Sequence, residues 1–136
     1  MPTDIVILDS NIVLDVFVFN DAAAQPLKAR LAVGALDWIA TQPMRDELAR
    51  VLDYPKIVLR RAGCTLSASD VLASFDQHTR LVEVAAKASV TCSDPDDQKF
   101  IDLAVAHKAL LLSKDRAVIS MQKRLLALGV QARAAI

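Results

Sequence analysis

Short apolar runs alternate with longer amphipathic stretches along most of the chain. In the first run, positions 5 to 8 are all apolar, as expected for a strand covered on both faces of a sheet. Comparable runs recur downstream, and strands are predicted at residues 4–8, 36–40, 81–84, 109–112 and 130–133. Buried strands separated by helical stretches are typical of an α/β fold with a mainly parallel sheet of about five strands.

The stretches between these runs carry signals for the beginnings and ends of helices. Pro43 stands at an early helical position, where proline is tolerated, and Ser67 is a suitable N-cap. Gly34 and Gly129 are suitable stops. Helices are predicted at residues 11–19, 25–33, 43–52, 68–78, 94–107 and 117–128. The residues between the break at Pro55 and the cap at Ser67 are expected to be irregular.

The chain length fits one domain spanning residues 1–136, and no repeat or linker divides the sequence. With 54% apolar and 24% charged residues, the composition is that of a globular protein and excludes a disordered one. No apolar run approaches the roughly 20 residues that a membrane span needs. The first residues do not resemble a secretory signal, so a cytoplasmic protein is expected. The two cysteines fit neither a zinc site nor a disulfide framework.

Acidic residues follow or flank several of the predicted strands. Asp9 comes directly after the first strand and Asp115 after a later buried one. Asp97 lies in the first turn of the helix before that later strand, and Glu47 lies in the helix after the second strand. Ligands of open α/β sheets bind outside the carboxyl ends of the strands. These four carboxylates are therefore expected to meet near one edge of the sheet.

Each of these acids also has a purely structural interpretation. Asp9 and the acids around Asp97 are suitable helix caps, which complement the helix dipole. Glu47 can be a solvated helix residue, and Asp115 can be a turn residue. The joint arrangement at strand ends, rather than any single position, favours a functional site.

Carboxylates brought close together repel one another, and a hard divalent cation relieves that repulsion. Oxygen-only ligation favours Mg²⁺ or Mn²⁺ over zinc. The chain has only three glycines, no phosphate-binding glycine loop and no Ser-His-Asp or Cys-His arrangement. Metal-assisted hydrolysis is the reaction class that remains.

Four segments together resemble the PIN domain family. They read LDSN at residues 8–11, RDELARVL at 45–52, DPDDQKF at 94–100 and LSKD at 112–115, in the order and rough spacing of that family. The closer resemblance is to a bacterial branch of toxin components of toxin–antitoxin systems, relatives of the VapC toxins. The Tyr54-Pro55-Lys56 element after the second segment is also similar to that branch.

This resemblance, which covers nearly the whole chain, implies a three-layer α/β/α sandwich with ribonuclease activity. It implies a homodimer and an antitoxin protein that blocks the site. Matched by position, the Mg²⁺- or Mn²⁺-binding and catalytic quartet is Asp9, Glu47, Asp97 and Asp115. The supporting polar residues are Asn11 and Ser113.

The run of three aspartates at the third motif leaves two alternatives for the third ligand. Asp97 is preferred because it stands seven residues before Ala104, as in the family's helix, and Asp96 is the alternative. Asp102 lies five residues beyond Asp97 and is expected to face elsewhere.

The charges are balanced, with 16 basic and 16 acidic residues, unlike a simple nucleic-acid binder. Lys114 and Arg116 flank Asp115 and are candidates for contacts with RNA phosphates. The resulting prediction is a metal-dependent endoribonuclease, the toxin of a toxin–antitoxin pair. The alternative is a non-catalytic PIN-like module that binds RNA or a protein partner. A response-regulator receiver is excluded because no adjacent acidic pair follows the first strand.

Overall fold

The computed structural model describes residues 4–136. Within these residues the strands form one sheet in the order β3-β2-β1-β4-β5, and every pairing is parallel. The strands are β1 (Asp4–Leu8), β2 (Leu36–Ala40), β3 (Thr79–Leu81), β4 (Leu110–Leu112) and β5 (Ala132–Arg133). The sequence-based prediction of an α/β fold with about five mainly parallel strands is confirmed. The first residues, on which the expected lack of a secretory signal partly rests, lie outside the described part.

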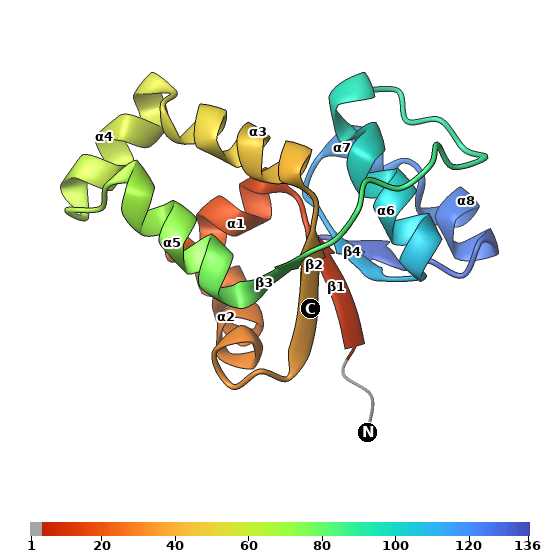
Figure 1. Cartoon of the computed structure of the whole chain (residues 1–136), viewed down its shortest axis with the longest axis horizontal. Coiled ribbons are helices and arrows are strands. Elements are labelled where there is room, and N and C mark those ends of the chain that lie inside the picture. Colours follow the sequence, from red (N-terminus) through yellow and green to blue (C-terminus); the bar gives the residue numbers. More distant parts are fainter. Residues whose placement is uncertain (1–3) are drawn as a thin grey trace.

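Helices cover both faces of the sheet and complete a three-layer α/β/α sandwich (Figure 1). On one side lie α1 (Ser10–Phe17), α2 (Gln25–Ala32), α3 (Gln42–Leu52), α4 (Pro55–Gly63) and α5 (Ala68–His78). On the other side α6 (Gln98–His107) packs on β1 and β4. The short helices α7 (Arg116–Ile119) and α8 (Gln122–Ala127) pack on β5. No helix within residues 4–136 is long and apolar enough to cross a bilayer.

Three parts of the predicted element pattern were wrong. Residues 55–63 form α4, because Pro55 opens a new helix in the same way that Pro43 opens α3. The expected helix at 117–128 is split into α7 and α8, where the Ser120 hydroxyl bonds back to the carbonyl of Ala117. The strand expected at 81–84 begins at Thr79, directly after α5, because pairing starts at Trp38 of β2.

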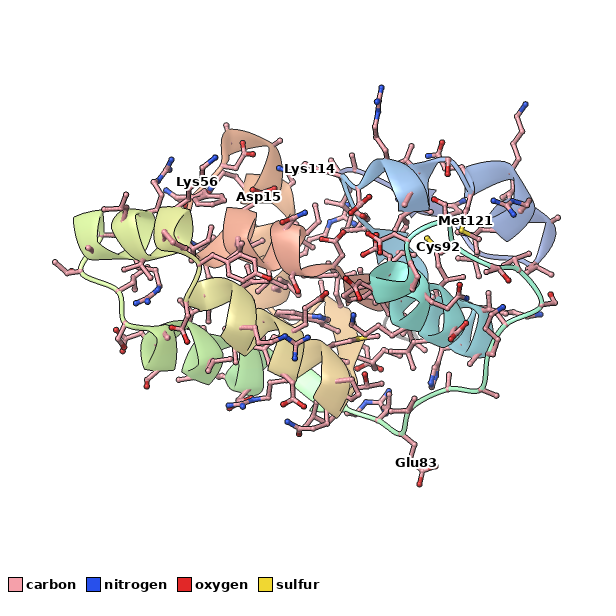
Figure 2. All side chains as sticks on the ribbon, turned by 90° about the horizontal axis from the view of Figure 1, so that it is seen from above. Asp15, Lys56, Glu83, Cys92, Lys114 and Met121 are labelled. Atoms are coloured by element: carbon pink, nitrogen blue, oxygen red, sulfur yellow. The ribbon has the colours of Figure 1, made fainter. Side chains whose placement is uncertain are left out.

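The connection after β3 is irregular and runs along the surface to a 3-10 turn, η2 (Pro95–Asp97). Glu83 points outward from it (Figure 2). Its later part is tied to α6, because Asp102 accepts a hydrogen bond from the backbone N–H of Ala88. Gln98 makes similar bonds to the backbone of Val90 and Cys92. These bonds fix the approach of the chain to η2.

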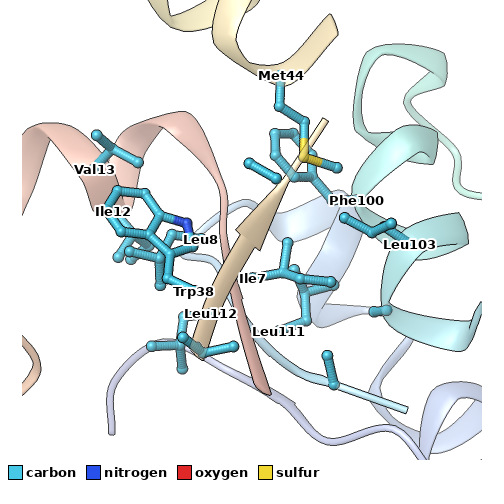
Figure 3. Packing of buried hydrophobic residues seen from close by; sticks show 14 of the residues in the cluster. Ile7, Leu8, Ile12, Val13, Trp38, Met44, Phe100, Leu103, Leu111 and Leu112 are labelled. Atoms are coloured by element: carbon cyan, nitrogen blue, oxygen red, sulfur yellow. The ribbon is translucent and has the colours of Figure 1, made fainter. Parts of the chain in front are cut away.

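Alternating side chains of the central strands form the core on both faces. Leu8, Trp38 and Leu112 pack toward α1, whereas Ile7 and Leu111 pack toward α6 (Figure 3). All five are at most 4% exposed. The central strands are therefore covered on both faces, and polar side chains follow the carboxyl ends of β1 and β4.

Leu111→Ala is expected to lower the free energy of unfolding by about 2–5 kcal/mol, because it opens a cavity beneath α6. Leu126→Ala is the matched control, since Leu126 is 63% exposed on α8 and its change should stay within about 0.5 kcal/mol. Urea denaturation of both variants measures the difference. Equal losses would contradict the assignment of Leu111 to the core.

Candidate metal centre

The chain leaves β1 toward β2 and β3, then returns to place β4 on the other side of β1. The carboxyl ends of β1 and β4 therefore flank a switch point, where open α/β sheets bind ligands. Asp9 follows β1 and Ser113 follows β4 at this edge. The backbone N–H of Asp9 donates to the carbonyl of Leu112 over 3.1 Å, which joins the two strand ends directly.

Ser113 connects the two aspartates at this edge. Its buried hydroxyl donates a hydrogen bond to Oδ2 of Asp9, and it accepts one from the backbone N–H of Asp115 over 3.0 Å. Asp9 also caps α1, since its Oδ1 accepts from the backbone N–H groups of Asn11 and Ile12. Asp115 caps α7 through Ala117. Capping and a role in the cleft are therefore compatible, because each carboxylate has two oxygens.

Three carboxylates converge beside this pair of strand ends. Asp94, Asp97 and Asp115 each place one oxygen within 4.8 Å of the others. Asp97 is only 7% exposed, and its Oδ2 has no hydrogen-bond partner within residues 4–136. A buried carboxylate oxygen without a partner is costly, so a cation at this position is a physically favourable occupant.

The electrostatics of the cluster agree with that geometry. The pKa of Asp97 is raised to about 7, mainly by burial and next by its neighbour Asp115, with smaller contributions from the charges of Asp94 and Asp9. Burial also raises the pKa of Asp9, although hydrogen bonds from Ser113, Asn11 and Ile12 oppose the increase. The cluster thus resists carrying its full negative charge without a counter-ion.

The wider cleft has a volume of about 320 Å³. It contains the four acids expected from the sequence, and also Asn11 and Asp96. Ser10 and Asp94 are among the lining residues that were not predicted for the site. Its lining residues are Asp9, Ser10, Asn11, Glu47, Val51, Tyr54, Asp94, Asp96, Asp97, Phe100 and Asp115. Asp96 is exposed, whereas Asp97 is buried within the cluster.

Glu47 lies in this cleft but is held by other groups. Ser10 Oγ donates to its Oε2 over 2.8 Å, and Lys99 Nζ lies 3.2 Å from its Oε1. Lys99 was not among the residues predicted for the site, although its side chain is only 22% exposed and is paired with Glu47. Its position one helical turn after Asp96 was the feature of the sequence that could have indicated a place near the site.

The two basic residues expected to contact phosphate lie apart from the lining of the cleft. Lys114 lies beside Asp15 (Figure 2). Its Nζ is 2.5 Å from the buried carboxylate of Asp15 and 4.0 Å from the partly exposed carboxylate of Asp21. Arg116 is exposed on α7. Asp102 faces away from the site, as expected, and binds Ala88 and Gln98 instead.

A model of the PIN domain family matches residues 5–117. The chain belongs to the PIN domain family. No curated protein matches the sequence. Among solved structures, a chain in the crystal structure of VapBC2 from Rickettsia felis bound to a DNA fragment from their promoter is similar, with a TM-score of 0.63 and 15% sequence identity. The match covers 94% of this chain and 98% of that chain. It confirms the PIN fold expected from the sequence motifs.

In the metal-free PIN domain, Asp97→Asn is expected to stabilise the fold at alkaline pH. The pKa of Asp97 is about 7 in the folded chain against its ordinary 3.8, so the folded state binds the proton more tightly and stability falls as pH rises between these values. In chelator at pH 8 the variant should melt roughly 4 °C higher, equivalent to about 1 kcal/mol, with a smaller difference at pH 5. Thermal melts at both pH values, beside the exposed Asp46→Asn, measure this. A pH-independent difference would contradict it.

Proposed function

We propose that this PIN domain is a metal-dependent endoribonuclease that hydrolyses RNA phosphodiester bonds. The observation that carries the proposal is the convergence of Asp94, Asp97 and Asp115 around a buried carboxylate oxygen without a partner. Membership of the PIN family and the oxygen-only chemistry of the cluster support the same conclusion.

The residues present fit Mg²⁺ or Mn²⁺. Asp94, Asp97 and Asp115 would hold the ion, and Asp9 lies beside them with one oxygen on Ser113. When bound, such an ion supplies charge stabilisation at phosphoryl oxygens and lowers the pKa of water. The cluster contains no nitrogen or sulfur ligand, which disfavours zinc.

The chain's own groups position the acids and the substrate. Ser113 fixes Asp9 relative to Asp115, and Asn11 lies exposed in the lining of the cleft, where its amide can contact substrate or solvent. Tyr54 lines the same cleft and is 56% exposed, so an unpaired RNA base can stack on its ring. Arg116 remains a candidate for RNA phosphate, whereas Lys114 is already paired with Asp15.

We further propose that the nuclease is the toxin of a toxin–antitoxin pair and forms a homodimer. The structural similarity to a chain of the VapBC2 crystal structure supports an antitoxin partner. Apolar side chains exposed on α4, Val58 and Leu59, offer a surface that such a partner can cover. An antitoxin bound near Tyr54, at the start of α4, would obstruct the cleft.

Asp9→Asn is expected to lower RNA cleavage by at least about 100-fold without unfolding the protein, because asparagine still caps α1. The assay uses a fluorescently labelled RNA pool with Mg²⁺, with Mn²⁺ and with chelator. Asp46→Asn, an exposed change beside Glu47 on α3, should retain the activity of the unchanged protein.

Full activity of Asp9→Asn, or cleavage that persists in chelator, would contradict a metal-dependent nuclease built on these acids. RNA binding without cleavage, undiminished when the acids are neutralised, would instead identify a non-catalytic RNA-binding module. Both results are read from the same set of reactions by electrophoresis and by fluorescence anisotropy.

A further inference from the structure

Glu47 and Lys99 form a fixed ion pair inside the cleft. The side chains are 17% and 22% exposed, and both oxygens of Glu47 are already occupied, one by Ser10 and one by Lys99. The ammonium of Lys99 also donates to the backbone carbonyl of Asp96 and lies 5.0 Å from the centroid of the Phe100 ring. The pair is therefore held from α1, α3 and the start of α6.

The cation-binding geometry lies elsewhere in the same cleft. The oxygens within 4.8 Å of one another belong to Asp94, Asp97 and Asp115, and the unpartnered oxygen belongs to Asp97. Glu47 is not a member of that group. A divalent ion bound to Glu47 would have to displace Lys99 from Oε1 or the Ser10 hydroxyl from Oε2. In either position it would be repelled by the ammonium of Lys99, which lies 3.2 Å from Oε1.

We propose that the cleft is a one-ion centre in which the ammonium of Lys99 fills the position of a second cation. Glu47 then orients Lys99 and is a positioning residue, whereas Asp94 is a ligand of the ion. Sites with two ions place a pair of cations roughly 3.5–4 Å apart to neutralise a phosphoryl group. Here the ammonium of Lys99 supplies one of the two positive charges. Lysine binds phosphate as a point charge, so it can act in this position. The inference rests on the proposed nuclease function for its purpose, but its test uses the metal alone.

The first test is titration of the purified full chain with Mn²⁺, followed by electron paramagnetic resonance of the free ion. The unchanged protein should bind one Mn²⁺. Asp94→Asn and Asp97→Asn should each weaken binding at least tenfold. Glu47→Gln should stay within threefold of the unchanged protein, as should its matched control Asp46→Asn. Binding of two ions, or an equal loss for Glu47→Gln and Asp97→Asn, would overturn the proposal.

The second test changes the lysine. Lys99→Gln removes the positive charge and should allow a second, weaker Mn²⁺ to bind, whereas Lys99→Arg keeps the charge and should still bind one ion. Adding Glu47→Gln to Lys99→Gln should abolish binding of the second Mn²⁺. A general loss of packing would not produce this rescue by arginine. A stoichiometry of one ion for Lys99→Gln would overturn the role of Lys99.

The one-ion centre and the proposed nuclease function can be contradicted separately. A protein that binds one Mn²⁺ with the predicted ligand dependence but cleaves no RNA would leave the one-ion centre intact and remove the proposed nuclease function. A protein that cleaves RNA while binding two ions, one of them dependent on Glu47, would do the reverse.

Discussion

Repulsion among carboxylates at the carboxyl edge of the sheet is the constraint on which the site depends. Asp94, Asp97 and Asp115 lie so close together that their negative charges repel one another, and the burial of Asp97 removes water that would screen it. Burial and this repulsion raise the pKa of Asp97 to about 7. The cluster therefore favours binding of a small hard cation. Without one it lowers the free energy of unfolding, and the apolar core must offset this loss.

The fold makes this arrangement possible because it fixes the backbone beneath each acid. Direct pairing of β1 with β4 brings Asp9 and Ser113 together although they are separated by 104 residues in sequence. Helix caps orient Asp9 and Asp115 with one oxygen each, and the η2 turn presents Asp94 and Asp97 from one short segment. Short turns at strand ends and helix starts therefore carry these acids.

Most of the strands and helices could be predicted from the sequence, and each wrong prediction has an identifiable cause. The strands β1, β2 and β4 were predictable because they are short apolar runs covered on both faces, and Pro43 and Ser67 mark the starts of α3 and α5. Helix α4 was missed because Pro55 was interpreted as a break, whereas it opens a second helix directly after α3. The short β3 was misplaced because it begins at once after α5.

The sequence predicted which segments form the cleft, but not all of the contacts between the side chains within it. Motif order indicated that Asp9, Glu47, Asp97 and Asp115 would share one cleft, and they line it together. Asp94 looked like a helix cap, and it is one, since it accepts from the N–H of Asp96. Only the three-dimensional arrangement reveals that it also faces Asp97 and Asp115. The pairing of Lys99 with Glu47 spans 52 residues and likewise has no local signature.

The most direct test of the account is the anomalous scattering of crystals of the full chain soaked in Mn²⁺. The account predicts one peak, bounded by carboxylate oxygens of Asp94, Asp97 and Asp115, with the Glu47–Lys99 ion pair intact beside it. A peak coordinated by Glu47 with Lys99 displaced, or no peak at a concentration that saturates binding in solution, would contradict it.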